Sequence, residues 1–484
     1  MSPLKRLFEQ TFIYGLATVL PRVLSVLLLP LYTEVFENAD GYGEYTKIYA
    51  WIAIFNVVLA YGMETAFFRF YLKEKSKFSV IATSLISLLC STLLFGLLAL
   101  LFKEHLAHLT GIKVEYIEFT IFILALDALA IVPFALLRAK ERPMRYAVLK
   151  LINVGINLGF NVFFLLLLPR LAQDDQGFFK QLYQSDFEIP YIFISNIMAS
   201  GITLLLVSPV YFRVKYSFDR VLWKRMMKYA IPVMFAGIAF TINEVLDKIL
   251  VAEMVSDAEA GKYAACYKLA LFMTLYGTAF RLGVEPFFFS HSNSKTPEKT
   301  YATITTYFVI LGSFILLSVV VFADLLKVLF VRNEVYWEAM EVVPIILLAS
   351  FCLGIYHNLS VWYKVTDRTR YGAYISSIGA VLTLIINFAL IPVMGYIASA
   401  LATLTAYATM MALSYYFGRK YYPIPYNLRK ILFYGGISIG FSILSFYVFN
   451  RNLIVGTLFL FVFLGLIYKL EGDNLKRIFL KSES

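Results

Sequence analysis

The sequence predicts an all-helical membrane protein that crosses the bilayer about 14 times. Of its 484 residues, 60% are hydrophobic and only 15% are charged, whereas soluble domains carry about 25% charged residues. The mean hydropathy is +0.73. Apolar residues gather into runs long enough to cross a bilayer as helices, which takes about 20 residues. We expect two pseudo-symmetric six-helix lobes around a central cavity, followed by two C-terminal helices.

The expected helices are joined by short connections, the longest of which runs from Pro169 to Glu188, so no extramembrane domain is predicted. The first span is too long for a signal-peptide core and lacks an A-x-A cleavage site, so we interpret it as an uncleaved helix. The fourteen spans are about 8–34, 44–71, 78–102, 115–138, 145–168, 189–212, 229–251, 260–288, 301–323, 339–363, 371–392, 395–418, 428–449 and 453–469.

The distribution of Lys and Arg predicts that both termini are cytoplasmic. With the N-terminus inside, 29 of the 43 Lys and Arg residues fall in inner segments and 8 in outer segments, while six lie within spans. Basic residues of short loops concentrate on the cytoplasmic side of membrane proteins. The net charge of +11 is therefore explained by topology, and no nucleic-acid partner is expected.

A weak internal repeat predicts the domain organisation. Gly43-Glu44-Tyr45 opens the second span and Gly261-Lys262-Tyr263 opens the eighth, 218 residues or six spans later, each after a short acidic segment. Parallel repeats are a common transporter plan, with the substrate site between the halves. We expect an N-terminal lobe at 1–212, a cytoplasmic linker at 213–228 that is partly a surface helix, a C-terminal lobe at 229–418, and an appendage at 419–484.

Charged residues within apolar spans are the main functional candidates. A charge at mid-bilayer costs roughly 3 kcal/mol or more, so such residues usually face a protein interior or an aqueous cavity. The spans 229–251 and 260–288 are rich in them and are our candidate for half of a transport cavity. The candidates are the cations Arg22, Lys47, Lys248, Lys268 and Arg281, and the acids Glu64, Asp127, Glu244, Asp247 and Glu285.

A purely structural role competes with function at several of these positions. Glu244 with Lys248, Arg281 with Glu285, and Glu44 with Lys47 have the spacing of ion pairs along one helix. By contrast, Arg22, Lys268, Glu64, Asp127 and Asp247 have no oppositely charged residue three or four positions away. A contact between helices, such as Arg22 with Asp127, is an open alternative. Arg22 follows Pro21, which can kink the helix and free a carbonyl beside the guanidinium.

No enzyme or cofactor motif is found. The four histidines do not fit H-E-x-x-H, and there is no G-x-x-x-x-G-K-[ST] for a bound nucleotide. We therefore expect no catalytic residue, no metal site and no cofactor.

The order of these segments resembles the polysaccharide transporters, the O-antigen flippase branch of the multidrug/oligosaccharidyl-lipid/polysaccharide (MOP) exporter superfamily. The likeness is carried by ENADGYGEYTKIYAW and GMETAFFRFY around the second span, and by KYAIPVMFAGIAFTINEVLDKILVAEM and GKYAACYKLA at the midpoint. The family usually has Arg after the Asp at the position of Asp247. The Lys248 found here weakens any argument for bidentate phosphate contact.

The resemblance implies a flippase that moves an oligosaccharide on a polyprenyl diphosphate across the bacterial inner membrane by alternating access. Arg22, Lys47, Lys268 and Arg281 would bind the diphosphate, while the prenyl tail stays in the lipid. Glu64, Asp127, Glu244, Asp247, Lys248 and Glu285 are the candidates for gating or for coupling to a proton or sodium ion. Membrane lipids and other polysaccharide-assembly proteins are the further expected partners.

Three alternatives stay open from the sequence. A cation-coupled drug exporter of the same superfamily would favour an acidic and aromatic cavity, against which Arg22 argues mildly. A membrane polymerase or ligase of glycan assembly would be expected to carry a sizeable outer loop with catalytic residues, and the longest connection here is about 20 residues. Charges within the spans argue against a pure scaffold.

Overall fold

The structure, a computed structural model, describes residues 13–480 apart from 14, 16–18, 25, 175, 176, 292–295 and 367; the side chains of 174, 285, 286, 289–291 and 473–480 are not described. The described part of the chain is all-helical, and twelve of its helices are long and apolar enough to cross a membrane. The predicted span 260–288 corresponds to two helices, with a shorter apolar stretch at Leu271–Val284. Ten of the 27 residues of the predicted first span (8–12, 14, 16–18 and 25) lie outside the described residues. The predicted fold class is confirmed.

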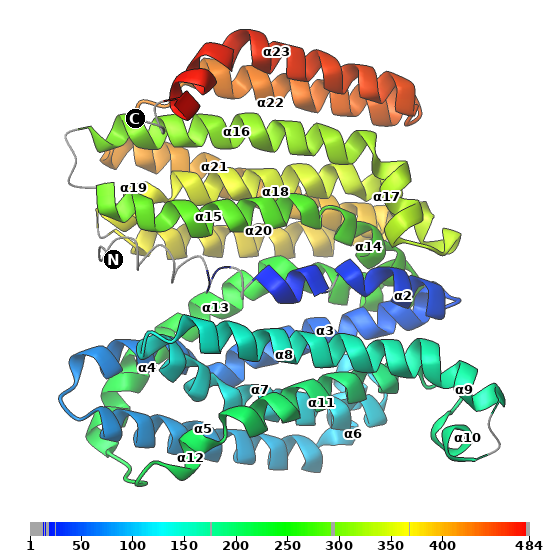
Figure 1. Ribbon diagram of the computed structural model, residues 1–484, viewed down its shortest axis with the longest axis vertical. Helices are drawn as coiled ribbons and strands as arrows, with labels where there is room; N and C mark the ends of the chain where they lie inside the picture. The colour runs from blue at the N-terminus through cyan, green and yellow to red at the C-terminus, as the bar shows by residue number, and fades with distance from the viewer. Residues whose placement is uncertain are drawn as a thin grey trace. The chain divides into compact units, whose positions relative to one another are not determined.

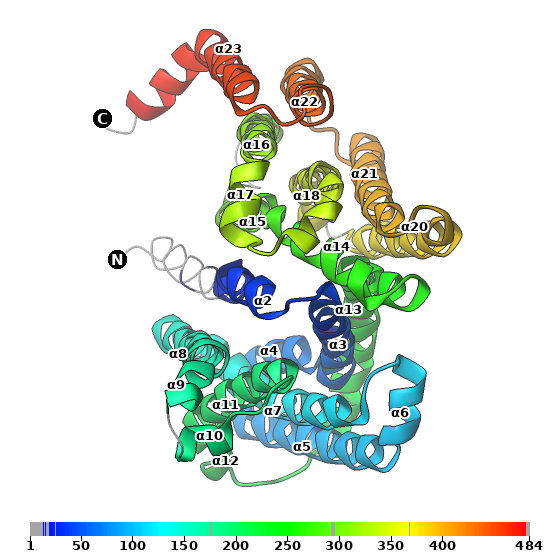
Figure 2. The same cartoon turned by 90° about the vertical axis from the view of Figure 1, so that its right-hand side faces the viewer.

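The chain forms two compact units (Figures 1 and 2). Unit 1 comprises residues 1–264 with 383–399, and unit 2 comprises 265–382 with 400–484. The boundaries of the two lobes predicted from the repeat differ from those of these two units, and the lobes stay a prediction.

Unit 1 is a bundle in which α7 packs between α5 and α11, and α13 packs along α3. Its helices are α2 (Leu29–Val35), α3 (Ala39–Ala60), α4 (Met63–Lys73), α5 (Lys77–Leu101), α6 (Lys103–Thr110), α7 (Val114–Ala139), α8 (Pro143–Val162), the π-helical η1 (Phe163–Leu167), α9 (Leu168–Asp174), α10 (Phe178–Leu182), α11 (Glu188–Val207), α12 (Pro209–Phe212), α13 (Arg220–Met254) and the start of α14 (Asp257–Leu269).

Unit 2 is centred on α16, which packs against α15, α18, α22 and α23. Its helices are α15 (Leu271–His291), α16 (Pro297–Val321), α17 (Ala323–Phe330), the 3-10 helix η2 (Glu334–Glu341), α18 (Val342–Leu359), α19 (Val361–Val365), most of α20 (Arg370–Met394), most of α21 (Tyr396–Tyr421), α22 (Leu428–Ile443), the π-helical η3 (Leu444–Val448) and α23 (Leu453–Leu480).

The predicted helix before the seventh span is not a separate element, because α13 runs unbroken from Arg220 to Met254; its place at the membrane surface stays a prediction. Asp219 caps this helix by accepting a hydrogen bond from the Leu222 backbone N–H at 2.9 Å. Three residues that follow one another at intervals of four positions are fully buried: Leu222, Met226 and Ala230. Their packing in the core of unit 1 extends the helix well before the start of the hydropathy signal.

The second span is broken in its middle, between α3 and α4. Tyr61 and Gly62 both adopt the left-handed conformation, with φ of 31° and 73°. A Cβ atom at residue 62 would lie 2.3 Å from the Ala230 carbonyl oxygen of α13, so only glycine fits here. The break frees backbone groups of a membrane helix, which is tolerated where they face protein or water.

Candidate transport cavity

Unit 1 contains a cavity of about 570 Å³, within the range of ordinary ligand sites. It is lined from α3, α4, α7, α8, α11 and α13. The break at Gly62 lies in its wall, as does Pro21. The polar side chains of the lining are Asn56, Glu64, Thr65, Asp127, Tyr146, Lys150, Asn153, Asn196, Ser200 and Thr203.

The carboxylate of Asp127 is held at the wall of this cavity. Ser200 of α11 donates a hydrogen bond to Asp127 Oδ1 at 2.9 Å. Next to it, the Asn196 amide donates to the Tyr49 hydroxyl at 2.8 Å. Of the predicted coupling residues, Asp127 and Glu64 line the cavity. The contact of Arg22 with Asp127 that the sequence left open stays a prediction.

Glu64 is neutralised across the helices. Its Oε1 accepts a charge-assisted hydrogen bond from Arg138 Nη1 at 2.6 Å, with both side chains nearly half exposed. The remaining charges of the lining are therefore Asp127 and Lys150, one of each sign.

Lys150 was assigned no role by the sequence analysis, although it is one of the six cations within spans. Its Nζ lies 4.5 Å from the centre of the Phe134 ring, a cation–π distance. Asn153 follows one turn later on α8 and donates to the Thr203 hydroxyl at 3.1 Å. Lys150, Asn153, Asn157 and Asn161 recur at helical spacing along α8. This polar stripe was the signal that could have identified the site.

Lys47 lies outside this lining, in an ion cluster on α3 in which Lys47 is buried and its two acidic partners are partly exposed. Its side chain is 5% exposed and its Nζ lies 3.1 Å from Asp257 and 3.4 Å from Glu253. It also donates to the Gly111 carbonyl oxygen at 3.2 Å. The alternative pairing with Glu44 is wrong, since Glu44 contacts Lys113 at 3.4 Å. The substrate role of Lys47 stays a prediction, which its enclosed position does not support.

Beside this cluster, the two repeat glycines meet. A Cβ atom at Gly43 would lie 1.7 Å from the Asp257 carbonyl oxygen, and one at Gly261 would lie 2.1 Å from the Ala39 carbonyl oxygen. Each glycine thus faces the carbonyl four residues before the other. The weak repeat in the sequence has a physical reason, because α3 and α14 cross with their backbones in contact.

Asp247 and Lys248 form a buried pair on α13. Lys248 Nζ lies 2.9 Å and 3.1 Å from the two Asp247 oxygens, and Tyr263 donates to Asp247 Oδ2 at 2.7 Å. Lys248 also donates to the backbone oxygen of Glu244 at 3.1 Å. Asp247 was expected to lack a partner on its own helix, because no cation lies three or four positions away. It pairs instead with the adjacent residue, and pairs at that spacing are not covered by the i,i+3 and i,i+4 rule for helices.

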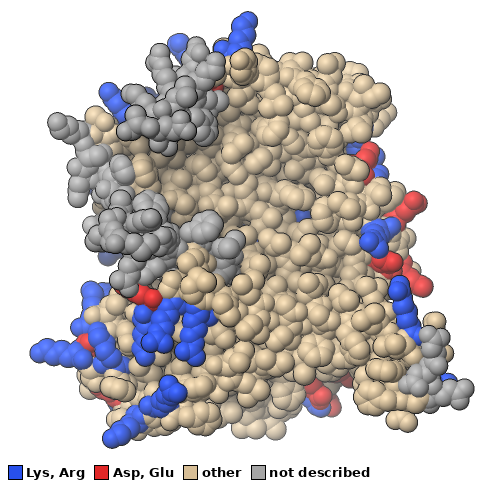
Figure 3. All heavy atoms as spheres, viewed as in Figure 1, with Lys and Arg blue, Asp and Glu red and all other residues tan. Residues whose placement is uncertain are grey.

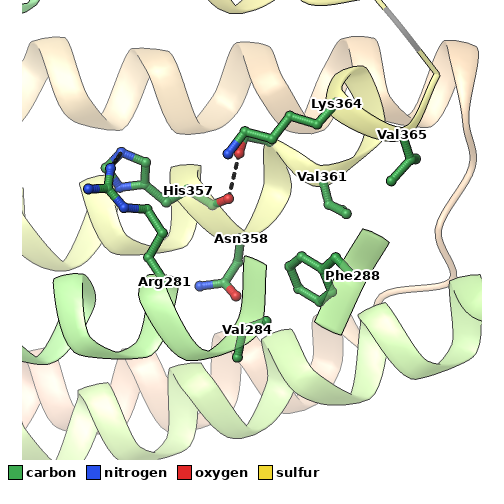
Figure 4. Close-up of a pocket in the computed structure, with 9 residues that line it drawn as sticks. Arg281, Val284, Phe288, His357, Asn358, Val361, Lys364 and Val365 are labelled. Atoms are coloured by element: carbon green, nitrogen blue, oxygen red, sulfur yellow. Dashed lines mark hydrogen bonds between the residues drawn. The ribbon is translucent and has the colours of Figure 1, made fainter. Parts of the chain in front are cut away.

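Arg281 lies in a small pocket of unit 2 (Figure 4). Its Nη1 is 3.2 Å from His357 Nε2, and Lys364 lines the same pocket. The expected pair of Arg281 with Glu285 involves the Glu285 side chain, which lies outside the described part of the chain. Arg22 and Lys268 are half-buried and each has an interaction partner, so their substrate roles stay predictions.

Comparison with protein families decides the class of this protein. The model of the polysaccharide biosynthesis protein family matches residues 7–284, more than half of the chain. The chain belongs to this family. The MatE family model also matches, over residues 232–389. A comparison with curated protein sequences gives no match.

Solved structures support the same fold. The structure of "Lipid II flippase MurJ, inward closed conformation" aligns with a TM-score of 0.74 at 14% identity, covering 94% of this chain and 98% of that one. An inward-facing multidrug resistance MATE transporter of the MOP superfamily aligns with a TM-score of 0.65 at 13% identity, covering 84% and 94%. A MOP transporter from Pyrococcus furiosus gives 0.60 at 12%, covering 87% and 98%. The described part of the chain therefore has the fold of these membrane transporters, and its family is that of the polysaccharide biosynthesis proteins.

Proposed function

We propose that this transporter is a flippase that moves a polyprenyl-diphosphate-linked oligosaccharide across the bacterial cytoplasmic membrane for the synthesis of surface polysaccharide. The observation that carries the proposal is the lining of the cavity in unit 1, where Asn56, Asn153 and Asn196 gather with hydroxyl groups around one cation, Lys150. Amides and hydroxyls can both donate to and accept from sugar hydroxyls.

The charge of the lining supports a glycan rather than a drug cation. A cavity for organic cations needs uncompensated acids, whereas Glu64 is paired with Arg138 and Lys150 balances Asp127 in number. A cation in a cavity is the group that a diphosphate would need at mid-bilayer. The apolar prenyl tail needs no such site because it can stay in the lipid. Alternating access then requires two states whose balance the substrate shifts.

The test is a flipping assay with the purified full chain in proteoliposomes. A fluorescent polyprenyl-diphosphate oligosaccharide is placed in both leaflets, and the fraction accessible to an added glycosidase is followed over time. Wild-type protein should render the inner-leaflet pool accessible, and protein-free liposomes should not. Gradient-driven efflux of an organic cation without glycolipid flipping would instead assign the protein to the drug exporters.

We further propose that both termini are cytoplasmic, as the Lys and Arg distribution indicates. Reporter fusions after Lys113 and Arg332 should give an outside signal, and fusions after Lys75 and Lys224 an inside signal. An outside signal at Lys224 would overturn the arrangement of two halves joined on the inner side.

A further inference from the structure

Unit 1 carries a second pocket, of about 190 Å³, lined by α5, α7, α8, α11, α12 and the turn between α7 and α8. Five apolar residues of its lining are buried: Ile81, Leu136, Leu137, Leu149 and Val207 are each less than 10% exposed. A packed cluster that includes Phe134 and Leu137 separates it from the transport cavity. Phe134 lines the transport cavity, whereas Leu137 lines this pocket.

Four cations surround this apolar pocket: Lys140, Arg142, Arg145 and Arg213. All four are exposed. Figure 3 shows Lys and Arg side chains gathered at the end of unit 1 where α8 begins, on the left in that view.

The N-terminus of α8 adds to this positive charge. Arg142 is its N-cap residue, no side chain caps the helix, and its first turn contains no acidic residue. Cations at the positive end of a helix dipole are unfavourable unless an anion is present. Unpaired backbone N–H groups at such an end bind anions readily. The apolar pocket, the four cations and the uncapped helix all favour a ligand with an anionic head and an apolar body.

We infer that this pocket binds an anionic phospholipid of the cytoplasmic leaflet, with its phosphate among the four cations and part of an acyl chain between α7 and α12. Basic pockets between helices on the cytoplasmic side are known to hold such head groups. The lipid-linked sugar fits this pocket less well, because its lining has no amide or hydroxyl side chain for a glycan. The inference rests on the proposed orientation of the chain but not on the transported substrate.

The test counts lipids retained by the full chain after reconstitution into equal parts of phosphatidylglycerol and phosphatidylcholine, using native mass spectrometry. The pocket variant replaces Arg142 and Arg145 by Gln. The matched control replaces Lys215 and Arg220 by Gln, which removes the same charge from exposed residues near the same end of unit 1 but outside the pocket. Preference for phosphatidylglycerol should fall about tenfold or more in the pocket variant and stay unchanged in the control.

A third variant, Val210→Trp, fills the pocket while leaving all four cations in place, and it should also weaken phosphatidylglycerol retention. It decides the question if the double Gln variant fails to fold. Equal losses in the pocket and control variants would overturn the inference in favour of general surface charge. The inference would also be overturned if inorganic phosphate displaced phosphatidylglycerol, or if a polyprenyl phosphate displaced it. Flipping of the glycolipid is measured in a separate assay. Failure of the lipid-binding inference can therefore be told apart from failure of the proposed flippase function.

Discussion

At the scale of single residues, Lys150 is the cation that the structure brings to the transport cavity. We predict that Lys150→Met lowers the rate of glycolipid flipping about tenfold or more, since a hydrogen bond to a charged group contributes about 1.5–3 kcal/mol. Lys150→Arg should keep part of the activity. Lys180→Met, on α10 and outside the cavity, is the control for general charge loss. Normal flipping by Lys150→Met would remove Lys150 from the substrate path.

Lys47 is predicted to stabilise the fold rather than to bind the substrate. Lys47→Met leaves Glu253 and Asp257 side by side without their cation, and both are partly exposed, so we expect a loss of about 1–3 kcal/mol in the free energy of unfolding. Thermal unfolding in detergent measures it. Lys103→Met breaks an exposed pair with Glu118 and should lower the melting temperature much less. Equal effects of the two substitutions would contradict a special stabilising role of the buried Lys47.

The sequence identified most of the charged candidates but not their partners. Partners along one helix follow from spacing, whereas Lys47 meets Asp257 from 210 residues away. The pairing of Asp247 with its neighbour Lys248 was equally hidden, because it depends on how both side chains bend within the packed bundle. Lys150 was recognised as a charge within a span, and the amides at helical spacing after it would have predicted one polar face.

At the scale of helices, the crossing of α3 and α14 is the tightest contact between two backbones near the ion cluster. We predict that Gly43→Ala destabilises the protein by about 1–3 kcal/mol, because the added methyl group collides with the Asp257 carbonyl and forces the helices apart. Gly155→Ala on α8 is the matched control, since a Cβ atom there meets nothing within 4 Å. The melting temperatures of the two variants measure the difference. A Gly43→Ala variant as stable as Gly155→Ala would exclude a close crossing.

Most spans were predicted from hydropathy because a lipid-exposed backbone must form its hydrogen bonds within the helix. The ends of helices outside the apolar region follow other rules. α13 begins at Arg220 through its Asp219 cap, and α9 carries the fifth span past Pro169 to Asp174 after a π-helical segment. Capping and core packing set these boundaries, and neither is visible in a hydropathy average.

At the scale of the whole molecule, the proposed transport needs, for energy coupling, a group that binds an ion in one state more tightly than in the other. Asp127 and Asp247 were both coupling candidates from the sequence, and their surroundings now separate them. Asp247 is only 2% exposed and is held by Lys248 and Tyr263. Asp127 lies in the cavity wall, where Ser200 donates to it. We therefore expect Asp127 to couple transport and Asp247 to stabilise α13.

The prediction is tested in proteoliposomes with imposed proton, sodium or electrical gradients. Wild-type protein should flip the glycolipid faster with at least one of these gradients, because ion binding at Asp127 biases the two states. Asp127→Asn should lose that acceleration and keep basal flipping. Asp247→Asn should instead lower the unfolding temperature, since it leaves Lys248 buried without its carboxylate. If wild-type rates are the same under every gradient, Asp127 does not couple transport, and consumption of the substrate outside the membrane must drive it.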